Sequence, residues 1–298
     1  MKKIPVILDT DIGTDIDDHW ALAFLLKCPE IDLKMVLTDT GDTVYRAKHA
    51  AKMLETANRT DVVVAVGRKF PDEQRFMEGW VKDYRLEKYP GKVRYDGVNA
   101  MVEEIMARPD KTTLLCISAM PNLADAVEMA PEIAGKIRFV GMHGSIYRGY
   151  DGKFGPDAES NVKYHNESLR RVFSMLKDIT IAPLDTCGIV KLEGELYSRI
   201  KYSEKPLNKA VMENYRLWRE NVKWHTDCDP EKESSVLFDT VAAYLVYSEE
   251  LVEMKRLSVK ITPDGMTVPD INGISLRAAL KWKNLGRFRE TLVKRLLA

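Results

Sequence analysis

The sequence has no excess of either charge and no long apolar run. Its 298 residues include 45 Lys and Arg and 45 Asp and Glu, so the formal net charge is zero. We expect no nucleic-acid partner, because binding phosphates requires a basic excess or a basic face. No apolar run reaches the 18 residues that would predict a membrane span, so no membrane association is expected either.

The sequence also lacks paired cysteines, internal repeats and linkers rich in Pro, Gly or Ser. The four cysteines have no C-x-x-C spacing and fit a reduced, cytoplasmic protein. Asp9 and Asp11 interrupt the apolar stretch near the N-terminus, which is then too short for a signal peptide. We therefore expect a cytoplasmic globular protein with a single domain over residues 1–298.

Short apolar segments alternate with segments of helical spacing through the first two thirds of the chain. The expected strands are Ile4–Asp9, Leu33–Thr38, Asp61–Val66, Thr112–Ile117, Ile137–Met142 and Ile179–Leu184. The expected helices between them are His19–Lys27, Val44–Ala57, Val98–Ala107, Leu123–Met129 and Glu167–Lys177. Such alternation predicts an α/β fold with a mostly parallel, Rossmann-like central sheet flanked by helices. Ligands of such sheets bind beyond the carboxyl ends of the strands.

The last third predicts an added helical segment and a C-terminal β-hairpin. Residues Glu193–Lys223 and Asp239–Glu250 have helical spacing. The hairpin is expected from Leu257–Ile261 and Met266–Val268, which flank a Pro-Asp-Gly turn. A basic amphipathic helix is expected to close the chain.

Five carboxylates lie within ten residues directly after the first expected strand. They are Asp9, Asp11, Asp15, Asp17 and Asp18. Capping of the following helix would account for one or two of them. Five together repel one another unless protons or a cation compensate. Because carboxylates are hard oxygen ligands and no Cys or His set is near, the pattern favours Ca²⁺ or Mg²⁺ over Zn²⁺.

The segment ILDTDIGTDIDDHWALAFLL resembles the N-terminal signature of the nucleoside hydrolase (inosine–uridine preferring) family, D-T-D-P-G-x-D-D-A-x-A-L. This chain has two extra residues between Gly13 and the acidic pair. Either Asp15 or Asp17 could therefore hold the first position of that pair. The trailing Ala-Leu-Ala favours Asp17 and Asp18.

Further segments resemble the family's motifs in the same order along residues 4–245. They are Val36–Arg46 for T-x-x-G-N, His49–Gly67, Ser118–Ala124 for G-P-L-T-N-I-A, Gly141–Gly144, Ala158–Asn161 for A-E-F-N, Glu167–Phe173, Pro183–Thr186, and Leu237–Ala242 for H-D-P-x-A. Several positions depart from these motifs, among them Ser160, where the motif has phenylalanine. Asp42 replaces an asparagine, Pro121 replaces a threonine, and Phe238 replaces a histidine.

The resemblance implies a Ca²⁺-dependent hydrolase that cleaves the N-glycosidic bond of a small-molecule nucleoside, as in purine or pyrimidine salvage. It implies metal ligation by the side chains of Asp11, Asp18 and Asp239 and by the carbonyl of Pro121. Asp11 would also accept the proton of the attacking water. A backbone ligand tolerates proline, which lacks only the N–H. The resemblance further implies a homodimer or homotetramer.

The resemblance also implies a set of sugar contacts. Asp17 is expected to act in catalysis by contacting a ribose hydroxyl. Glu159 and Asn161 would hold the other hydroxyls, and Asp239 would contact the substrate as well as the ion. Asp42 at the asparagine position would change the sugar contact or attract a cationic substrate.

Phe238 cannot donate a proton to the leaving base, so another group must stabilise it. One alternative is stacking on an aromatic side chain, for which the candidates are Trp20, Trp80, Trp224, Tyr84 and Tyr147. The other is a different donor, either His225 or His19. The aromatic-rich segment 68–94 is expected to be a packing stripe or a lid over this base.

Two other functions remain open from the sequence. A relative that binds metal and ribose but has lost or altered its activity would also retain the acidic cluster. A haloacid-dehalogenase-type phosphatase would use Asp9 as its nucleophile, but that family wants Thr or Val at the position of Gly13 and an acidic partner for Asp185. Ribose release from nucleosides separates these alternatives from hydrolysis.

Overall fold

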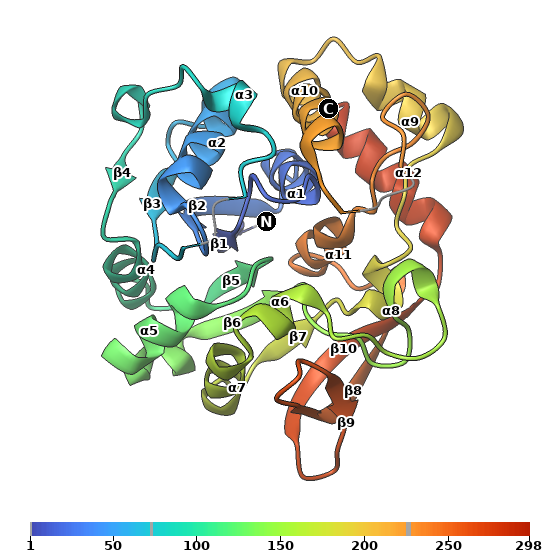
Figure 1. Cartoon of the computed structure of the whole chain (residues 1–298). Coiled ribbons are helices and arrows are strands. Elements are labelled where there is room, and N and C mark those ends of the chain that lie inside the picture. The colour runs from blue at the N-terminus through green and yellow to red at the C-terminus, as the bar shows by residue number, and fades with distance from the viewer. Residues whose placement is uncertain (1, 72–73, 225–227) are drawn as a thin grey trace.

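The computed structural model describes residues 2–71, 74–224 and 228–298 (Figure 1). Its centre is a ten-stranded sheet in the order β4-β3-β2-β1-β5-β6-β7-β10-β8-β9. The strands are β1 (Ile4–Thr10), β2 (Ile31–Thr38), β3 (Val63–Val66), β4 (Val93–Arg94), β5 (Thr112–Cys116), β6 (Ile137–Gly141), β7 (Ile179–Ile181), β8 (Val252–Ile261), β9 (Thr267–Pro269) and β10 (Ile274–Trp282). Strands β1 to β7 pair in parallel, which confirms the predicted α/β class.

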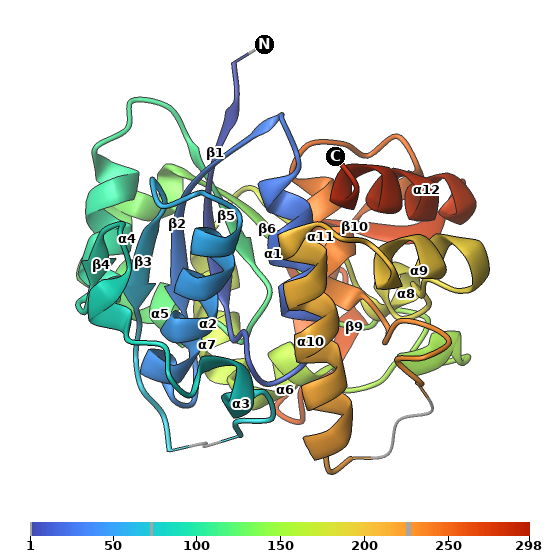
Figure 2. The same cartoon turned by 90° about the horizontal axis from the view of Figure 1, so that it is seen from above.

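Helices cover both faces of the sheet (Figures 1 and 2). On one face lie α1 (Asp17–Leu26), α2 (Thr43–Thr56), α9 (Gly194–Lys201), α10 (Pro206–Asn221), α11 (Phe238–Leu245) and α12 (Leu285–Leu296). On the other lie α4 (Gly97–Met106), α5 (Pro121–Met129) and α7 (Asn166–Met175). Shorter helices are α3 (Glu78–Val81), α6 (Ser160–Tyr164) and α8 (Leu184–Cys187), and the 3₁₀ turns are η1 (Leu86–Lys88), η2 (Pro131–Gly135) and η3 (Tyr150–Gly152). None of the described helices is long and apolar enough to cross a membrane.

The first strand is buried on both sides, as its apolar sequence predicts. Successive side chains of a strand point to opposite faces. Accordingly, Val6 and Leu8 pack into the core under α1 and α2, whereas Ile7 packs into the core under α4 and α5. Central parallel strands read as continuous apolar runs because helices cover both of their faces.

The strand register aligns the carboxyl ends of the central strands. Thr10 of β1 pairs with Thr38 of β2, and Asp9 pairs with Cys116 of β5. Cys116 pairs in turn with Gly141 of β6. The segments that follow these strands therefore meet at one edge of the sheet, and the acidic segment after β1 lies among them.

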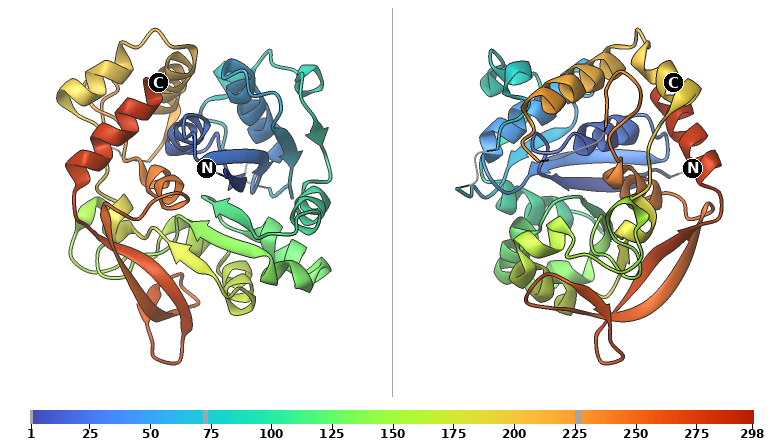
Figure 3. Two further views of the ribbon diagram at one scale, coloured as in Figure 1. Left: turned by 180° about the vertical axis from the view of Figure 1, so that it is seen from behind. Right: turned by 45° about the vertical axis from the view of Figure 1, so that its right-hand side comes forward.

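The C-terminal antiparallel part is larger than the predicted hairpin. Strands β8 and β9 include the expected pair, but β10 follows them and joins the antiparallel strands to the parallel sheet. Arg277 and Ala278 of β10 pair with Thr180 and Ile181 of β7. Figure 3 shows this antiparallel unit extending from the main body. The apolar and polar alternation of β10 is interrupted at the register shift between Ala279 and Lys281, and local sequence gives no sign of its long-range pairing with β7.

The described aromatic residues of segment 68–94 mainly pack against the core. Phe76, Trp80 and Tyr89 are buried in the core beside α2 and α10, so the packing interpretation holds for these aromatic side chains. The Tyr89 hydroxyl donates a hydrogen bond to the Val62 carbonyl at 2.9 Å. The long helix expected over 193–223 is divided into α9 and α10, and Pro206 starts the second.

Candidate active site

A cavity of about 570 Å³ opens at the carboxyl ends of the central strands. Its walls come from the segment after β1, the start of α1, the region around α6, and the segment that leads into α11. Predicted site residues in its lining are Asp11, Asp17, Asp18, Glu159, Asn161 and Asp239. Side chains far apart in the sequence therefore share one cavity.

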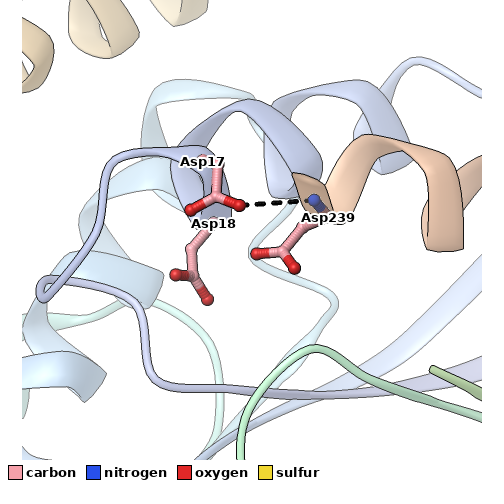
Figure 4. Close-up of side chains that lie close together, drawn as sticks. All are labelled: Asp17, Asp18 and Asp239. Atoms are coloured by element: carbon pink, nitrogen blue, oxygen red, sulfur yellow. Dashed lines mark hydrogen bonds between the residues drawn. The ribbon is translucent and has the colours of Figure 1, made fainter. Parts of the chain in front are cut away.

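Three carboxylates that line this cavity lie close together (Figure 4). Asp17 and Asp18 begin α1, and Asp239 lies in the first turn of α11. Each offers an oxygen within 4.8 Å of the others, and all three residues are buried. The packing of α1 against α11 creates this carboxylate cluster, which we call the acidic triad.

The electrostatics of the acidic triad favour a cation. Burial raises the pKa of Asp17, Asp18 and Asp239 well above the usual range, and repulsion from neighbouring carboxylates raises these pKa values further. A divalent ion would remove this penalty by compensating the charges. The donors are hard oxygens, and no His or Cys belongs to the triad, so the residues present fit Ca²⁺ or Mg²⁺.

Asp11 and Asp15 line the same cavity from the segment between β1 and α1. The charge of Asp11 contributes to the raised pKa values of Asp17, Asp18 and Asp239, so its carboxylate lies near the triad. Burial raises the pKa of Asp15 to about 6. The Asp15 carboxylate accepts a hydrogen bond from the Ile16 amide at 2.6 Å. The structure thus places Asp17, and not Asp15, in the acidic triad.

Glu159 and Asn161 project into the cavity from the start of α6. Glu159 caps this helix and accepts hydrogen bonds from the amides of Gly144, Asn161 and Val162 at 2.9, 2.6 and 3.2 Å. Burial raises the pKa of the Glu159 carboxyl to about 7, although these hydrogen bonds oppose the shift. The Asn161 amide donates to the Met142 carbonyl at 3.1 Å. Both side chains are thereby oriented before a ligand arrives.

Asp42 and Pro121 are not among the described residues that line the cavity. The Asp42 carboxylate caps α2 by accepting from the Tyr45 amide at 3.1 Å and forms an ion pair with Arg75. Pro121 is buried at the first position of α5. The next residue, Asn122, hydrogen bonds to Asp9 at 3.3 Å, which ties the start of α5 to the end of β1.

Aromatic side chains also line the cavity. Phe238, at the position where the family motif has histidine, contacts the Tyr150 ring edge-on with centroids 6.0 Å apart. Trp218 and Trp224 also line the cavity, and their ring centroids are 6.2 Å apart. Among the five aromatic candidates predicted to stack on the base, the structure places Trp224 at the cavity. Trp20, Trp80, Tyr84 and Tyr147 lie elsewhere.

Lys191 is a cavity residue that the sequence did not reveal, because it belongs to no motif. It follows α8, and its ammonium lies 3.4 Å from the Glu233 carboxylate. Trp218 was missed for a similar reason: its place on the expected helix 193–223 carries no sign of which face meets the site. Both positions depend on the packing of the second half of the chain.

His19, one of the two histidines considered as alternative proton donors, is not among the described residues that line the cavity. His19 is fully buried, and its Nε2 lies 3.0 Å from Nδ1 of His49, away from the lining residues. Burial lowers the pKa of His19 to about 3. The expectation for His19 is therefore wrong. His225 lies outside the described residues. Asp185 accepts from the amides of Ile146 and Tyr147 at 2.8 and 2.9 Å, a structural role.

Comparisons with known proteins agree with this geometry. Residues 6–289 match the family profile described as inosine-uridine preferring nucleoside hydrolase. Probable uridine nucleosidase 2 of Arabidopsis thaliana is 25% identical over an alignment of 309 residues. The alignment covers 97% of this chain and 88% of the relative. Non-specific ribonucleoside hydrolase RihC of Klebsiella pneumoniae is 30% identical over 197 residues, 61% of this chain and 62% of the relative.

Solved structures show the same architecture. The structure of a plant nucleoside hydrolase, the PpNRh1 enzyme, superposes with a TM-score of 0.80 at 21% identity and full coverage of both chains. The family profile identifies a hydrolase of N-glycosyl bonds, and the solved structures share its fold. The chain belongs to the inosine-uridine preferring nucleoside hydrolase family, whose members cleave ribonucleosides.

Proposed function

We propose that this protein uses Ca²⁺ to hydrolyse the N-glycosidic bond of a ribonucleoside, giving ribose and the free base. The observation that supports this most strongly is the buried acidic triad of Asp17, Asp18 and Asp239 in the lining of the cavity. Uncompensated, these carboxylates repel one another and are poorly solvated. With a divalent ion they become a site for water and for sugar hydroxyls.

Asp11, Asp18 and Asp239 line the cavity and would hold the ion with their side chains. The main-chain carbonyl of Pro121 is a further ligand only on the family resemblance, because Pro121 is not among the described residues that line the cavity. When bound, the ion would lower the pKa of a coordinated water and orient the sugar. Asp11 lines the cavity near the triad and would accept the proton that this water loses. The carboxylates would also stabilise the positive charge that develops on the ribose ring in the transition state.

The sugar contacts would come from both sides of the cavity. Asp17 is held by the Asp239 amide at 3.3 Å and would bind a ribose hydroxyl. Glu159 and Asn161 are oriented by backbone hydrogen bonds and would bind the remaining hydroxyls. The sugar contact expected of Asp42 is not part of this proposal, because the Asp42 carboxylate caps α2, pairs with Arg75 and is not among the described residues that line the cavity.

The leaving base would lie among Phe238, Trp218 and Trp224, where stacking disperses the charge of the departing ring. Lys191 is the cationic side chain among the described lining residues and would donate a hydrogen bond to the base. This arrangement replaces the histidine of the family motif. The names of the relatives include both a uridine nucleosidase and a non-specific hydrolase, so we propose ribonucleosides as the substrate class.

We further propose a single domain that acts in the cytoplasm as a homodimer or homotetramer. One continuous sheet supports a single domain, and four buried free cysteines are consistent with a reducing compartment. Light scattering on the purified protein measures the number of chains in the assembly.

The test of function is ribose release from a panel of purine and pyrimidine ribonucleosides, with Ca²⁺ and with excess chelator. We expect Ca²⁺-dependent ribose release that is lost in Asp11→Ala and retained in Asp178→Ala, a matched change at an exposed surface ion pair. Tight ribose binding without turnover would support the inactive relative instead. Phosphate release from phosphomonoesters would support the phosphatase alternative.

A further inference from the structure

A buried arginine lies beneath the segment that carries Asp11. Arg46 lies in the first turns of α2, and 2% of its surface is exposed. Its Nε donates a hydrogen bond to the Thr40 carbonyl at 2.8 Å. Its Nη1 donates to the Thr14 hydroxyl at 2.6 Å, to the Ile12 carbonyl at 3.3 Å and to the Asp11 carbonyl. One guanidinium therefore holds residues 11, 12 and 14 together.

The hydrogen-bond partners of Arg46 named above are neutral oxygens. Burying a guanidinium is costly unless its N–H groups are satisfied, and here main-chain carbonyls and a hydroxyl accept hydrogen bonds from Nε and Nη1. The positive charge also attracts the nearby Asp18 carboxylate. Arg46 therefore combines two effects that can be separated by experiment: it holds the segment after β1, and it places a cation near the acidic triad.

The neighbouring residue on α2 restrains the same segment. The Tyr45 hydroxyl donates to the Gly13 carbonyl and accepts from the Met77 amide, both at 3.2 Å. Gly13 has a φ of 106°, and a Cβ at this position would lie 2.7 Å from the Tyr45 ring. The backbone of residues 11–14 thus follows one path over adjacent side chains of α2.

We infer that Arg46 is a positioning residue that fixes residues 11–14 so that Asp11 faces the acidic triad, and thereby sets the affinity for the divalent ion. This inference rests on the proposed function. Groups that orient ligands from outside the coordination sphere commonly change metal affinity by about 10- to 100-fold. Arg46 lies among main-chain oxygens and contributes through Asp11.

The sign of the change in metal affinity separates positioning from simple charge. Arg46→Gln removes a cation that repels Ca²⁺, so charge alone predicts tighter Ca²⁺ binding in this variant. Loss of the hydrogen bonds frees the Asp11 backbone, so positioning predicts weaker binding. Arg138→Gln is the matched control, because Arg138 also donates to main-chain carbonyls, those of Val246 and Leu245 at 2.8 and 3.1 Å.

The experiment is calorimetric Ca²⁺ titration of the chelator-treated protein. We expect about tenfold or greater weakening of Ca²⁺ binding in Arg46→Gln and less than about twofold change in Arg138→Gln. Arg46→Lys keeps the charge but loses the planar guanidinium with its several N–H donors. Its Ca²⁺ affinity should therefore lie between those of Arg46→Gln and the wild-type protein. Unchanged or tighter binding in Arg46→Gln, or equal weakening in the control, would overturn the inference.

Amide hydrogen exchange tests the same inference without metal. In chelator, peptides covering residues 12–16 should exchange faster in Arg46→Gln than in the wild-type protein or in Arg138→Gln, and equal rates would overturn the positioning role. If the wild-type protein bound no divalent ion, the proposed function would be wrong. The hydrogen-exchange comparison would still test whether Arg46 positions residues 11–14. If Arg46→Gln does not fold, Thr14→Val provides a second test, because it removes one hydrogen-bond partner of Arg46. Residues 12–16 should still exchange faster in Thr14→Val than in the wild-type protein. Unchanged exchange in this variant would contradict the inference.

Discussion

The main-chain nitrogen of Asp239 donates a hydrogen bond to the Asp17 carboxylate at 3.3 Å, although 222 positions separate the two residues. The bond joins the first turns of α11 and α1. It places Asp239 beside the acidic pair after β1, and the three side chains then form the acidic triad. The site is consequently a product of helix packing between distant parts of the chain.

Asp239→Asn should change stability in opposite directions with and without metal. In chelator, the variant loses a buried carboxylate that neighbouring charges repel, so its melting temperature should rise. In Ca²⁺ it loses a ligand, so the stabilisation gained from metal binding should shrink. Thermal unfolding with chelator and with Ca²⁺ measures both effects. Asp178→Asn should show neither change, and a lower melting temperature of Asp239→Asn in chelator would refute the electrostatic account.

The metal-free protein should lose stability between about pH 4 and pH 8. Burial raises the pKa of Asp15 to about 6, of Glu159 to about 7 and of Asp9 to about 8. Unfolded carboxyls release their protons near pH 4. Between these values the folded state holds more protons, so raising the pH favours unfolding.

Each proton that the folded state retains and the unfolded state releases lowers the unfolding free energy by about 1.4 kcal/mol per pH unit. Denaturant unfolding in chelator at a series of pH values measures this slope. Added Ca²⁺ should flatten it, because the bound ion favours the ionised carboxylates. Stability that rose from pH 5 to pH 8 in chelator would contradict the electrostatic account.

Gly13→Ala should destabilise the protein. The position has a φ of 106°, which L side chains rarely adopt, and the added Cβ would lie 2.7 Å from the Tyr45 ring. Such backbone strain costs about 1–3 kcal/mol, and chemical denaturation measures it. Gly135→Ala is the control, because no atom lies within 4 Å of the Cβ it would add. Equal stability of the two variants would show that Tyr45 does not restrict the segment.

The effect of Lys191→Met on turnover should depend on the leaving group of the substrate. If Lys191 donates a hydrogen bond to the departing base, its loss should lower kcat by about tenfold or more for natural ribonucleosides. A p-nitrophenyl riboside, whose leaving group departs without such help, should be hydrolysed at nearly the wild-type rate. An equal loss with both substrates would assign Lys191 a structural role through its ion pair with Glu233.

The sequence predicted the parts of the site that depend on local pattern. The apolar run of β1 and the acidic residues after it place Asp11, Asp17 and Asp18 at a strand end, and the resemblance added Glu159, Asn161 and Asp239. The cavity lining includes all six. The sequence did not predict how distant segments pack against one another around the site.

Two residues illustrate this limit. Asp42 occupies the expected motif position, yet its carboxylate caps α2 and forms an ion pair with Arg75, which comes from another segment. Lys191 reaches the cavity through the placement of the segment after α8, which no local pattern encodes. Strand β10 was missed for a comparable reason, since its pairing with β7 joins residues about a hundred positions apart. Long-range contacts decide each case.

The most direct test of the central claim is to titrate the metal-depleted protein with Ca²⁺ while measuring ribose release from a ribonucleoside. The account predicts that the rate rises in proportion to bound Ca²⁺ and reaches its maximum at one ion per chain. Undiminished ribose release in excess chelator, or no release from any ribonucleoside at full Ca²⁺ occupancy, would contradict it.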